Sequence, residues 1–328
     1  MTVGVAAWLM LGLFLDGYAH ANILTGTESF LTPWHGVFYS GFVASAAWII
    51  YLIVRRTELG QPARRAIPIG YGWATIGIVV FAIGGIGDGI WHTLLGIEIS
   101  LDALFSPTHL LLFVGLFLII TAPLRAAWAR SDRGPSAFAS LFPAWLSTTL
   151  ATALVAFFLS YLWSPRLPWL PRQTFDPQSG DGEIMVMLGM ATMLITTLLL
   201  VAPTLLTLHR WRLPFGSFTV MWALVGSMIA AAFEPEELAV CFMTGLAGGL
   251  AVDATAWALR HLRVGHVARI VSGVGPLVMW AVYFAVLSTG EPIRWPVEVW
   301  AGSIGIAALA GLGLSLLVFP QPVPSVTS

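Results

Sequence analysis

The chain has 328 residues, of which 58% are hydrophobic and 9% are charged. An ordinary soluble domain carries about 25% charged residues, so this composition excludes a water-soluble globule. A mean hydropathy of +0.86 and repeated apolar runs of about twenty residues predict a polytopic membrane protein, because each run can cross the hydrocarbon layer as a helix. The net charge of -1 gives no support to nucleic-acid binding. The single cysteine, Cys241, excludes a disulfide framework or a thiolate metal cage within the chain.

Apolar runs bounded by charged residues, proline and glycine predict an all-α transmembrane helix bundle of about ten spans. In chain order the expected spans cover residues 3–24, 34–54, 69–92, 107–127, 138–162, 184–208, 214–233, 238–259, 270–288 and 297–319. We expect one integrated membrane domain. Residues 1–130 carry a duplicated N-terminal helix hairpin in this interpretation, and residues 131–328 form a supporting bundle.

The arginines predict the orientation of these spans. All fifteen basic residues are arginines. In a ten-span arrangement twelve of them lie on one side of the membrane, and three lie on the other side: Arg166, Arg172 and Arg294. By the positive-inside rule, the side with the other twelve is cytoplasmic. Both termini are therefore expected in the cytoplasm of a bacterial-type cell. Two longer connections on the outer face, residues 164–183 and 288–296, are rich in proline and tryptophan and are expected to lie at the membrane interface.

Two segments share the pattern D-G-x2-H, a spacer, then [DE]-x3-[ST]-P-x-H. The first extends from Asp16 to His35 and the second from Asp88 to His109. An acid, an imidazole, a hydroxyl and a proline repeat in step, which indicates an internal duplication of a helix hairpin.

The repeated motif contains side chains that commonly bind metals. In each copy the aspartate and the first histidine are four residues apart, so they share one face at the outer end of a helix. The second histidine lies in the first turn of the returning helix, after an N-cap hydroxyl and a proline at the first helical position (Thr32 and Pro33, Ser106 and Pro107). If the hairpins pack side by side, six candidate metal ligands meet at one depth: Asp16, His20, His35, Asp88, His92 and His109.

Clustered ionisable groups in a membrane need compensation, since each costs about 2.5 to 3.5 kcal/mol at the bilayer centre. A bound cation supplies this compensation most directly, while a structural hydrogen-bond network or a proton-conducting cavity is the alternative. Imidazole ligands suit zinc, copper, iron and nickel, whereas the added carboxylates favour iron, manganese or zinc, so the residue types alone leave the metal open. Glu28 and Asp102, the acids that open the second half of each motif, are candidates for orienting ligands or transferring protons.

The motif resembles the intramembrane copper motif D-x3-H-x12-H found in one of the membrane subunits of particulate methane and ammonia monooxygenases. Here the spacer between the two histidines is fourteen residues in the first copy and sixteen in the second. The resemblance implies a membrane copper oxidoreductase in which the aspartate and two histidines of each copy bind the metal.

The first functional hypothesis is an integral membrane metalloprotein, an oxidoreductase of monooxygenase type. Its one or two Cu or Fe ions would lie at the outer side of the membrane and act on a small apolar or lipid-borne substrate, with redox partner proteins supplying electrons. The second is a metal-ion or proton transporter or metal-handling protein. Asp253 is the clear intramembrane acid on an inward path, either as a relay or paired with Arg260. The third is a non-catalytic, haem-binding component of a membrane redox complex.

Overall fold

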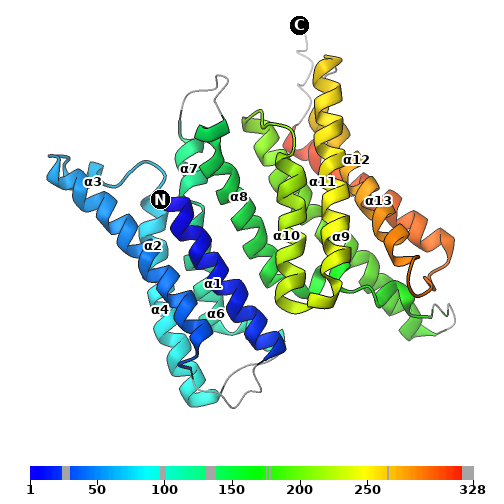
Figure 1. Cartoon of the computed structure of the whole chain (residues 1–328), viewed down its shortest axis with the longest axis horizontal. Helices are drawn as coiled ribbons and strands as arrows, with labels where there is room; N and C mark the ends of the chain where they lie inside the picture. Colours follow the sequence, from blue (N-terminus) through cyan, green and yellow to red (C-terminus); the bar gives the residue numbers. More distant parts are fainter. Residues whose placement is uncertain are drawn as a thin grey trace, which may run out of the picture. The chain divides into compact units, whose positions relative to one another are not determined.

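The computed structural model describes residues 1–23, 30–96, 101–130, 138–174, 176, 179–263 and 266–319, without the side chains of residues 63, 64, 102 and 103. Within these ranges every regular element is a helix, as the composition predicts (Figure 1). The α-helices are α1 (Thr2–Asn22), α2 (Pro33–Glu58), α3 (Ala63–Ala66), α4 (Gly72–Leu95), α5 (Leu101–Phe105), α6 (Pro107–Ile120), α7 (Ala122–Trp128), α8 (Phe138–Phe158), α9 (Gly180–Arg210), α10 (Ser217–Phe233), α11 (Leu238–His261), α12 (Val267–Leu287) and α13 (Val297–Val318). Short 3-10 turns are η1 (Ser160–Leu162), η2 (Ser164–Arg166), η3 (Leu170–Arg172) and η4 (Pro235–Glu237).

The long helices have the length and composition of membrane spans. Among the described residues, 8 helices are long and apolar enough to cross a membrane, and the bent pair α6 and α7 makes 9 if it forms one span. Helix α10 is apolar but shorter, with 17 residues. Each of the ten expected spans coincides with one of these helices or with the bent pair. The chain is therefore a multi-pass membrane protein by these criteria.

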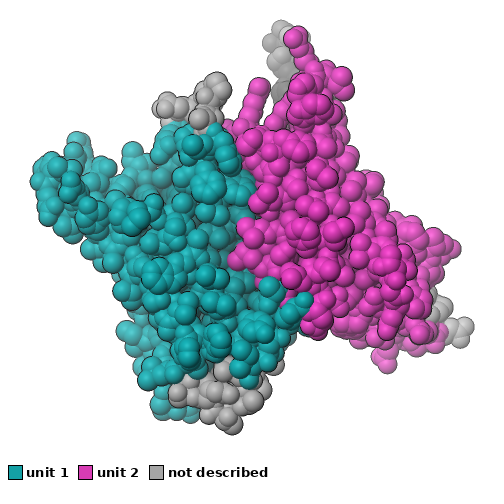
Figure 2. Space-filling view, in the orientation of Figure 1, with its two compact units in different colours: residues 1–161, 231–235 teal, residues 162–230, 236–328 magenta. Residues whose placement is uncertain are grey.

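The chain divides into two compact units (Figure 2). Unit 1 comprises residues 1–161 with 231–235, and unit 2 comprises residues 162–230 with 236–328. Both motif copies lie in unit 1.

The two helices of each motif hairpin pack against each other at matching glycines. A methyl group added at Gly12 of α1 would lie 2.5 Å from Phe38 Cα of α2, so only glycine permits this approach. In the second hairpin, a methyl group at Gly84 of α4 would lie 2.9 Å from the backbone nitrogen of Leu112 in α6. Each glycine precedes the motif aspartate of its own helix by four residues, one turn away.

A second pair of glycines repeats this correspondence on the returning helices. A methyl group at Gly41 would lie 2.6 Å from Leu9 Cα, and one at Gly115 would lie 2.6 Å from the Phe81 nitrogen. Both glycines follow the second motif histidine by six residues. The two hairpins thus use equivalent positions for their closest helix contacts, and these contacts fix the motif side chains at equivalent heights.

Helices α6 and α7 form an elbow of 41° at Thr121, a break that lies within the expected span 107–127. Pro123 lacks the N–H that would continue the helical hydrogen bonds. At this break the guanidinium of Arg125 donates to the Leu118 carbonyl at 2.6 Å and to the Gly70 carbonyl at 3.1 Å. The elbow is therefore held by a charged side chain that belongs to the fold.

In unit 2 the two proline-rich connections contact each other. The backbone nitrogen of Arg294 donates to the Pro171 carbonyl at 2.9 Å, and the Arg294 guanidinium donates to Thr174 Oγ1 at 3.1 Å. Trp295 fits over Gly189 of α9, where a methyl group would lie 2.5 Å from its ring. These contacts hold the connections together on one end of the unit.

Candidate metal centre

The returning helix of each hairpin begins as its sequence predicts. Thr32 Oγ1 accepts the backbone N–H of His35 at 3.2 Å, and Ser106 Oγ accepts that of His109 at 3.3 Å. A proline follows each cap in the first turn. The capping hydroxyl and the fixed φ of proline define where α2 and α6 begin, and so place each histidine in a first turn that faces the preceding helix.

In the first hairpin, one carboxylate lies between two imidazoles. Asp16 Oδ2 is 3.8 Å from His20 Nε2, and Asp16 Oδ1 is 3.4 Å from His35 Nε2. Asp16 and His20 come from α1 and His35 comes from α2. We call these three residues the first triad.

The second hairpin repeats this arrangement more compactly. Asp88 Oδ1 is 3.3 Å from His92 Nε2 and 3.0 Å from His109 Nε2. Asp88 and His92 lie on α4 and His109 lies on α6. These three residues form the second triad.

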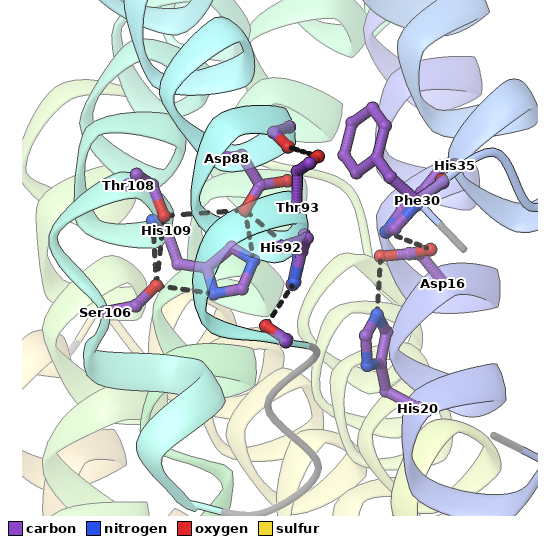
Figure 3. Close-up of polar contacts among 12 residues, drawn as sticks. Asp16, His20, Phe30, His35, Asp88, His92, Thr93, Ser106, Thr108 and His109 are labelled. Atoms are coloured by element: carbon purple, nitrogen blue, oxygen red, sulfur yellow. Dashed lines mark hydrogen bonds and ion pairs between the residues drawn. The ribbon is translucent and has the colours of Figure 1, made fainter. Parts of the chain in front are cut away.

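The two triads meet within unit 1 (Figure 3). The His92 ring lies 5.9 Å from the His35 ring and 6.5 Å from the His20 ring, measured between centroids. Potential ligand atoms of His35, Asp88 and His92 lie within 4.8 Å of one another, and so do those of the first triad. The six predicted ligands therefore form one cluster from four helices.

In two of these rings, Nδ1 is engaged by a backbone carbonyl, so Nε2 is the nitrogen that faces a carboxylate. His35 Nδ1 is 2.6 Å from the Phe30 carbonyl, and His92 Nδ1 is 3.3 Å from the Gly96 carbonyl. A carbonyl oxygen only accepts, so Nδ1 carries the proton and a neutral ring presents the Nε2 lone pair to the carboxylate. Two acceptors then face each other. A cation or an additional proton between them relieves the repulsion, and an Nδ1 hydrogen bond to a carbonyl is the usual support of a metal-binding histidine.

Three of the four imidazole–carboxylate distances match those between neighbouring ligands of one ion, and the His20 distance of 3.8 Å is longer. Ligand atoms about 2.1 Å from a metal, at angles between octahedral and tetrahedral values, lie about 3.0 to 3.4 Å apart. The closest three imidazole–carboxylate distances in the cluster, those of His35, His92 and His109, are 3.4, 3.3 and 3.0 Å. Nitrogen-to-oxygen hydrogen bonds are about 2.7 to 3.2 Å long, so the His35 and His92 distances exceed that range, whereas the His109 distance of 3.0 Å also fits a hydrogen bond.

Burial makes the charge of the cluster costly without a cation. The Asp88 and His92 side chains are 2% and 1% exposed, while those of Asp16 and His20 are 14% and 15% exposed. With neutral imidazoles, the two carboxylates carry a charge of about -2 in a weakly solvated environment. One divalent or two monovalent cations would neutralise it.

Three residues that the sequence motif does not predict as site residues contact the cluster. Tyr39 Oη donates to Asp88 Oδ2 at 3.0 Å, and Thr108 Oγ1 donates to Asp88 Oδ1 at 3.4 Å. The Phe30 ring lies 4.8 Å from the His35 ring and 5.8 Å from the His92 ring, between centroids. Tyr39 follows His35 by four residues and so shares its helix face, which is the signal that could have revealed it.

The two acids expected to assist the metal are not placed. Glu28 lies outside the described residues, and of Asp102 the structure gives the backbone, in α5, without the side chain. Their proposed roles stay predictions.

Asp253, the intramembrane acid of the transporter hypothesis, has a structural role in unit 2. Its Oδ2 accepts the backbone N–H of Phe218 at 3.1 Å and that of Thr219 at 2.8 Å, together with the Thr219 hydroxyl at 2.7 Å. The carboxylate therefore caps the N-terminus of α10, a place where helix N–H groups and the helix dipole both favour negative charge. Neither expected role of Asp253, relay or partner of Arg260, is needed to explain its burial.

No protein-family model matches the chain, and searches of curated proteins and of solved structures find no significant match. The cluster in unit 1 is consequently the basis of the functional proposal.

Proposed function

We propose that this membrane protein is a metalloprotein whose six-residue cluster in unit 1 binds one or two transition-metal ions. The observation that carries the proposal is the repeated imidazole–carboxylate geometry, in which each motif aspartate faces two Nε2 atoms, three of them at ligand-to-ligand distances. Two imidazoles and one carboxylate leave coordination positions open, as a metal that binds oxygen or substrate requires.

Copper is the proposed metal, with iron second and zinc third. Support comes from the D-x3-H motif, which resembles the intramembrane copper motif of the methane and ammonia monooxygenases, and from the nitrogen-rich ligand set. Two groups of ligand atoms lie close enough to hold an ion, Asp16 with His20 and His35, and Asp88 with His35 and His92. We propose that the cluster binds one ion or two adjacent ions, with His109, 3.0 Å from Asp88, as a further ligand.

The proposed reaction class is oxygenation of a small apolar or lipid-borne substrate. In a monooxygenation, one atom of O2 enters a C–H bond and the other leaves as water, which consumes two electrons and two protons. The electrons would come from a redox partner protein. We place the site at the outer side of the cell membrane, since the loops richest in arginine are on the opposite ends of the motif helices.

Elemental analysis of detergent-purified protein tests the proposal. We expect one or two metal ions per chain, and loss of metal with retention of helix content in His20→Ala and His92→Ala. His261→Ala, on an exposed residue of α11 in unit 2, is the matched control and is expected to keep the metal. A metal content near zero in correctly folded protein after purification without chelator, and after incubation with Cu or Fe salts, would refute it. An optical spectrum of the same sample distinguishes a haem from a non-haem metal.

A further inference from the structure

Tyr39 makes a hydrogen bond from the first motif hairpin to the second triad. It lies on α2, four residues after the ligand candidate His35 of the first triad, and its hydroxyl donates to Asp88 of the second triad at 3.0 Å. The side chain crosses from one motif hairpin to the other. Its ring also lies 6.2 Å from the His35 ring between centroids, so it contacts both halves of the cluster.

The ring position depends on a glycine of the opposite hairpin. A methyl group added at Gly85 of α4 would lie 2.8 Å from Tyr39 Cε1, closer than side chains approach. Gly85 is three residues before Asp88 and therefore on the same side of α4. The absence of a side chain there leaves the space that the Tyr39 ring occupies.

The two oxygens of Asp88 have different partners. Oδ1 faces His92 Nε2 at 3.3 Å and His109 Nε2 at 3.0 Å and accepts the Thr108 hydroxyl at 3.4 Å. Oδ2 accepts the shorter bond from the Tyr39 hydroxyl, at 3.0 Å. A metal that bound both oxygens at once would therefore have to share Oδ2 with the Tyr39 hydroxyl.

We infer that Tyr39 is a positioning residue of the metal centre, which holds Asp88 as a monodentate ligand through Oδ1 and makes the second triad depend on the first hairpin. This inference rests on the proposed metal-binding function. Oδ2 is held by the Tyr39 hydroxyl while Oδ1 faces the two imidazoles, and ligating carboxylates are commonly held by such outer-shell hydrogen bonds. Loss of such a partner typically lowers metal affinity by about 10-fold to 100-fold.

The test compares Tyr39→Phe with the native protein after loading with Cu(II). Tyr39→Phe removes the hydroxyl and keeps the ring, so we expect metal still to bind, with affinity lower by about 10-fold to 100-fold and a changed Cu(II) electron paramagnetic resonance spectrum. Gly85→Ala displaces the ring without removing the phenol and is expected to change the spectrum in the same sense. Tyr51→Phe, on an exposed tyrosine of the same helix, is the matched control and should leave both affinity and spectrum unchanged.

Three outcomes would overturn the inference. A Tyr39→Phe spectrum and affinity equal to those of the native protein would show that the hydrogen bond does not position Asp88. A phenolate-to-metal charge-transfer band in the native protein, lost in Tyr39→Phe, would show that Tyr39 is itself a ligand. Equal loss of affinity in Tyr51→Phe would show a general effect on α2. Failure of the native protein to bind metal refutes the proposed function instead, so the two failures are distinguishable.

Discussion

Asp88 is more buried and has more hydrogen-bond partners than Asp16, its counterpart in the first hairpin. Asp88 is 2% exposed and accepts hydroxyl donors from Tyr39 and Thr108. Asp16 is 14% exposed, and its Oδ1 accepts no hydrogen bond from the described residues although His35 Nε2 lies 3.4 Å away. The two triads have the same residue types but differ in how firmly the carboxylate is held.

This difference predicts unequal effects of removing each carboxylate charge. We expect Asp88→Asn to lower metal affinity by about 100-fold or more, because it removes a preorganised charged ligand, and Asp16→Asn to have a smaller effect. Metal competition titrations measure both. Asp181→Asn, at an exposed site in the first turn of α9, is the control. A larger loss in Asp16→Asn than in Asp88→Asn would contradict the prediction.

The matching glycines predict that either hairpin is sensitive to one added methyl group. Gly12→Ala and Gly84→Ala place a methyl group 2.5 and 2.9 Å from the backbone of the partner helix, and each is expected to destabilise the fold by about 1 to 3 kcal/mol. Thermal unfolding in detergent measures the change. Gly4→Ala, on α1 with nothing within 4 Å of the added carbon, should have no such effect. Normal stability in both hairpin variants would argue against the close packing.

The capping hydroxyls predict separable effects on stability and on metal binding. Thr32→Ala and Ser106→Ala each remove an N-cap and should cost about 1 kcal/mol, and both should also weaken metal binding, because the cap orients the first-turn histidine. Ser179→Ala removes the equivalent cap of α9 in unit 2 and is the control. It should reduce stability alone, and reduced metal content in that variant would indicate that the loss follows from general destabilisation.

The capping role of Asp253 provides a test that distinguishes a fixed metal site from a transport path. Asp253→Ala leaves the first N–H groups of α10 without their acceptor, so we expect destabilisation by about 1 to 3 kcal/mol with unchanged metal content. Ion flux into proteoliposomes is the second measurement. Flux through the native protein that Asp253→Asn abolishes, with the fold intact, would support the transporter hypothesis over the proposed fixed site.

The orientation is tested by cysteine labelling, for which the chain is well suited. The native Cys241 is buried, so background labelling is low, and Cys241→Ser removes it. In that background, Thr289→Cys should react with an impermeant maleimide on intact cells, and Gln61→Cys only after permeabilisation. Both positions are exposed. The reverse pattern would place the cluster at the cytoplasmic side.

Much of the site could be predicted from the sequence, because the relative positions of several site residues depend only on neighbours a few residues away in the chain. The four-residue step from Asp16 to His20 and the Thr32-Pro33 helix start are local properties, and the structure confirms the predicted N-caps. Tyr39 was not predicted because its partner Asp88 is forty-nine residues away, and an ordinary aromatic residue on an apolar helix resembles any core residue. The elbow at Thr121 had a local signal in Pro123, but the surrounding apolar run is continuous.

The order of the six cluster residues along the chain has a consequence for biogenesis. Asp16, His20 and His35 all lie on α1 and α2, so the first triad is complete before any residue of the second has left the ribosome. The hydroxyl of Tyr39 then meets its carboxylate only when α4 is inserted beside the earlier hairpin. The six-residue cluster therefore forms only when the second hairpin packs against the first, which is translated earlier, and the Tyr39 contact forms at that step.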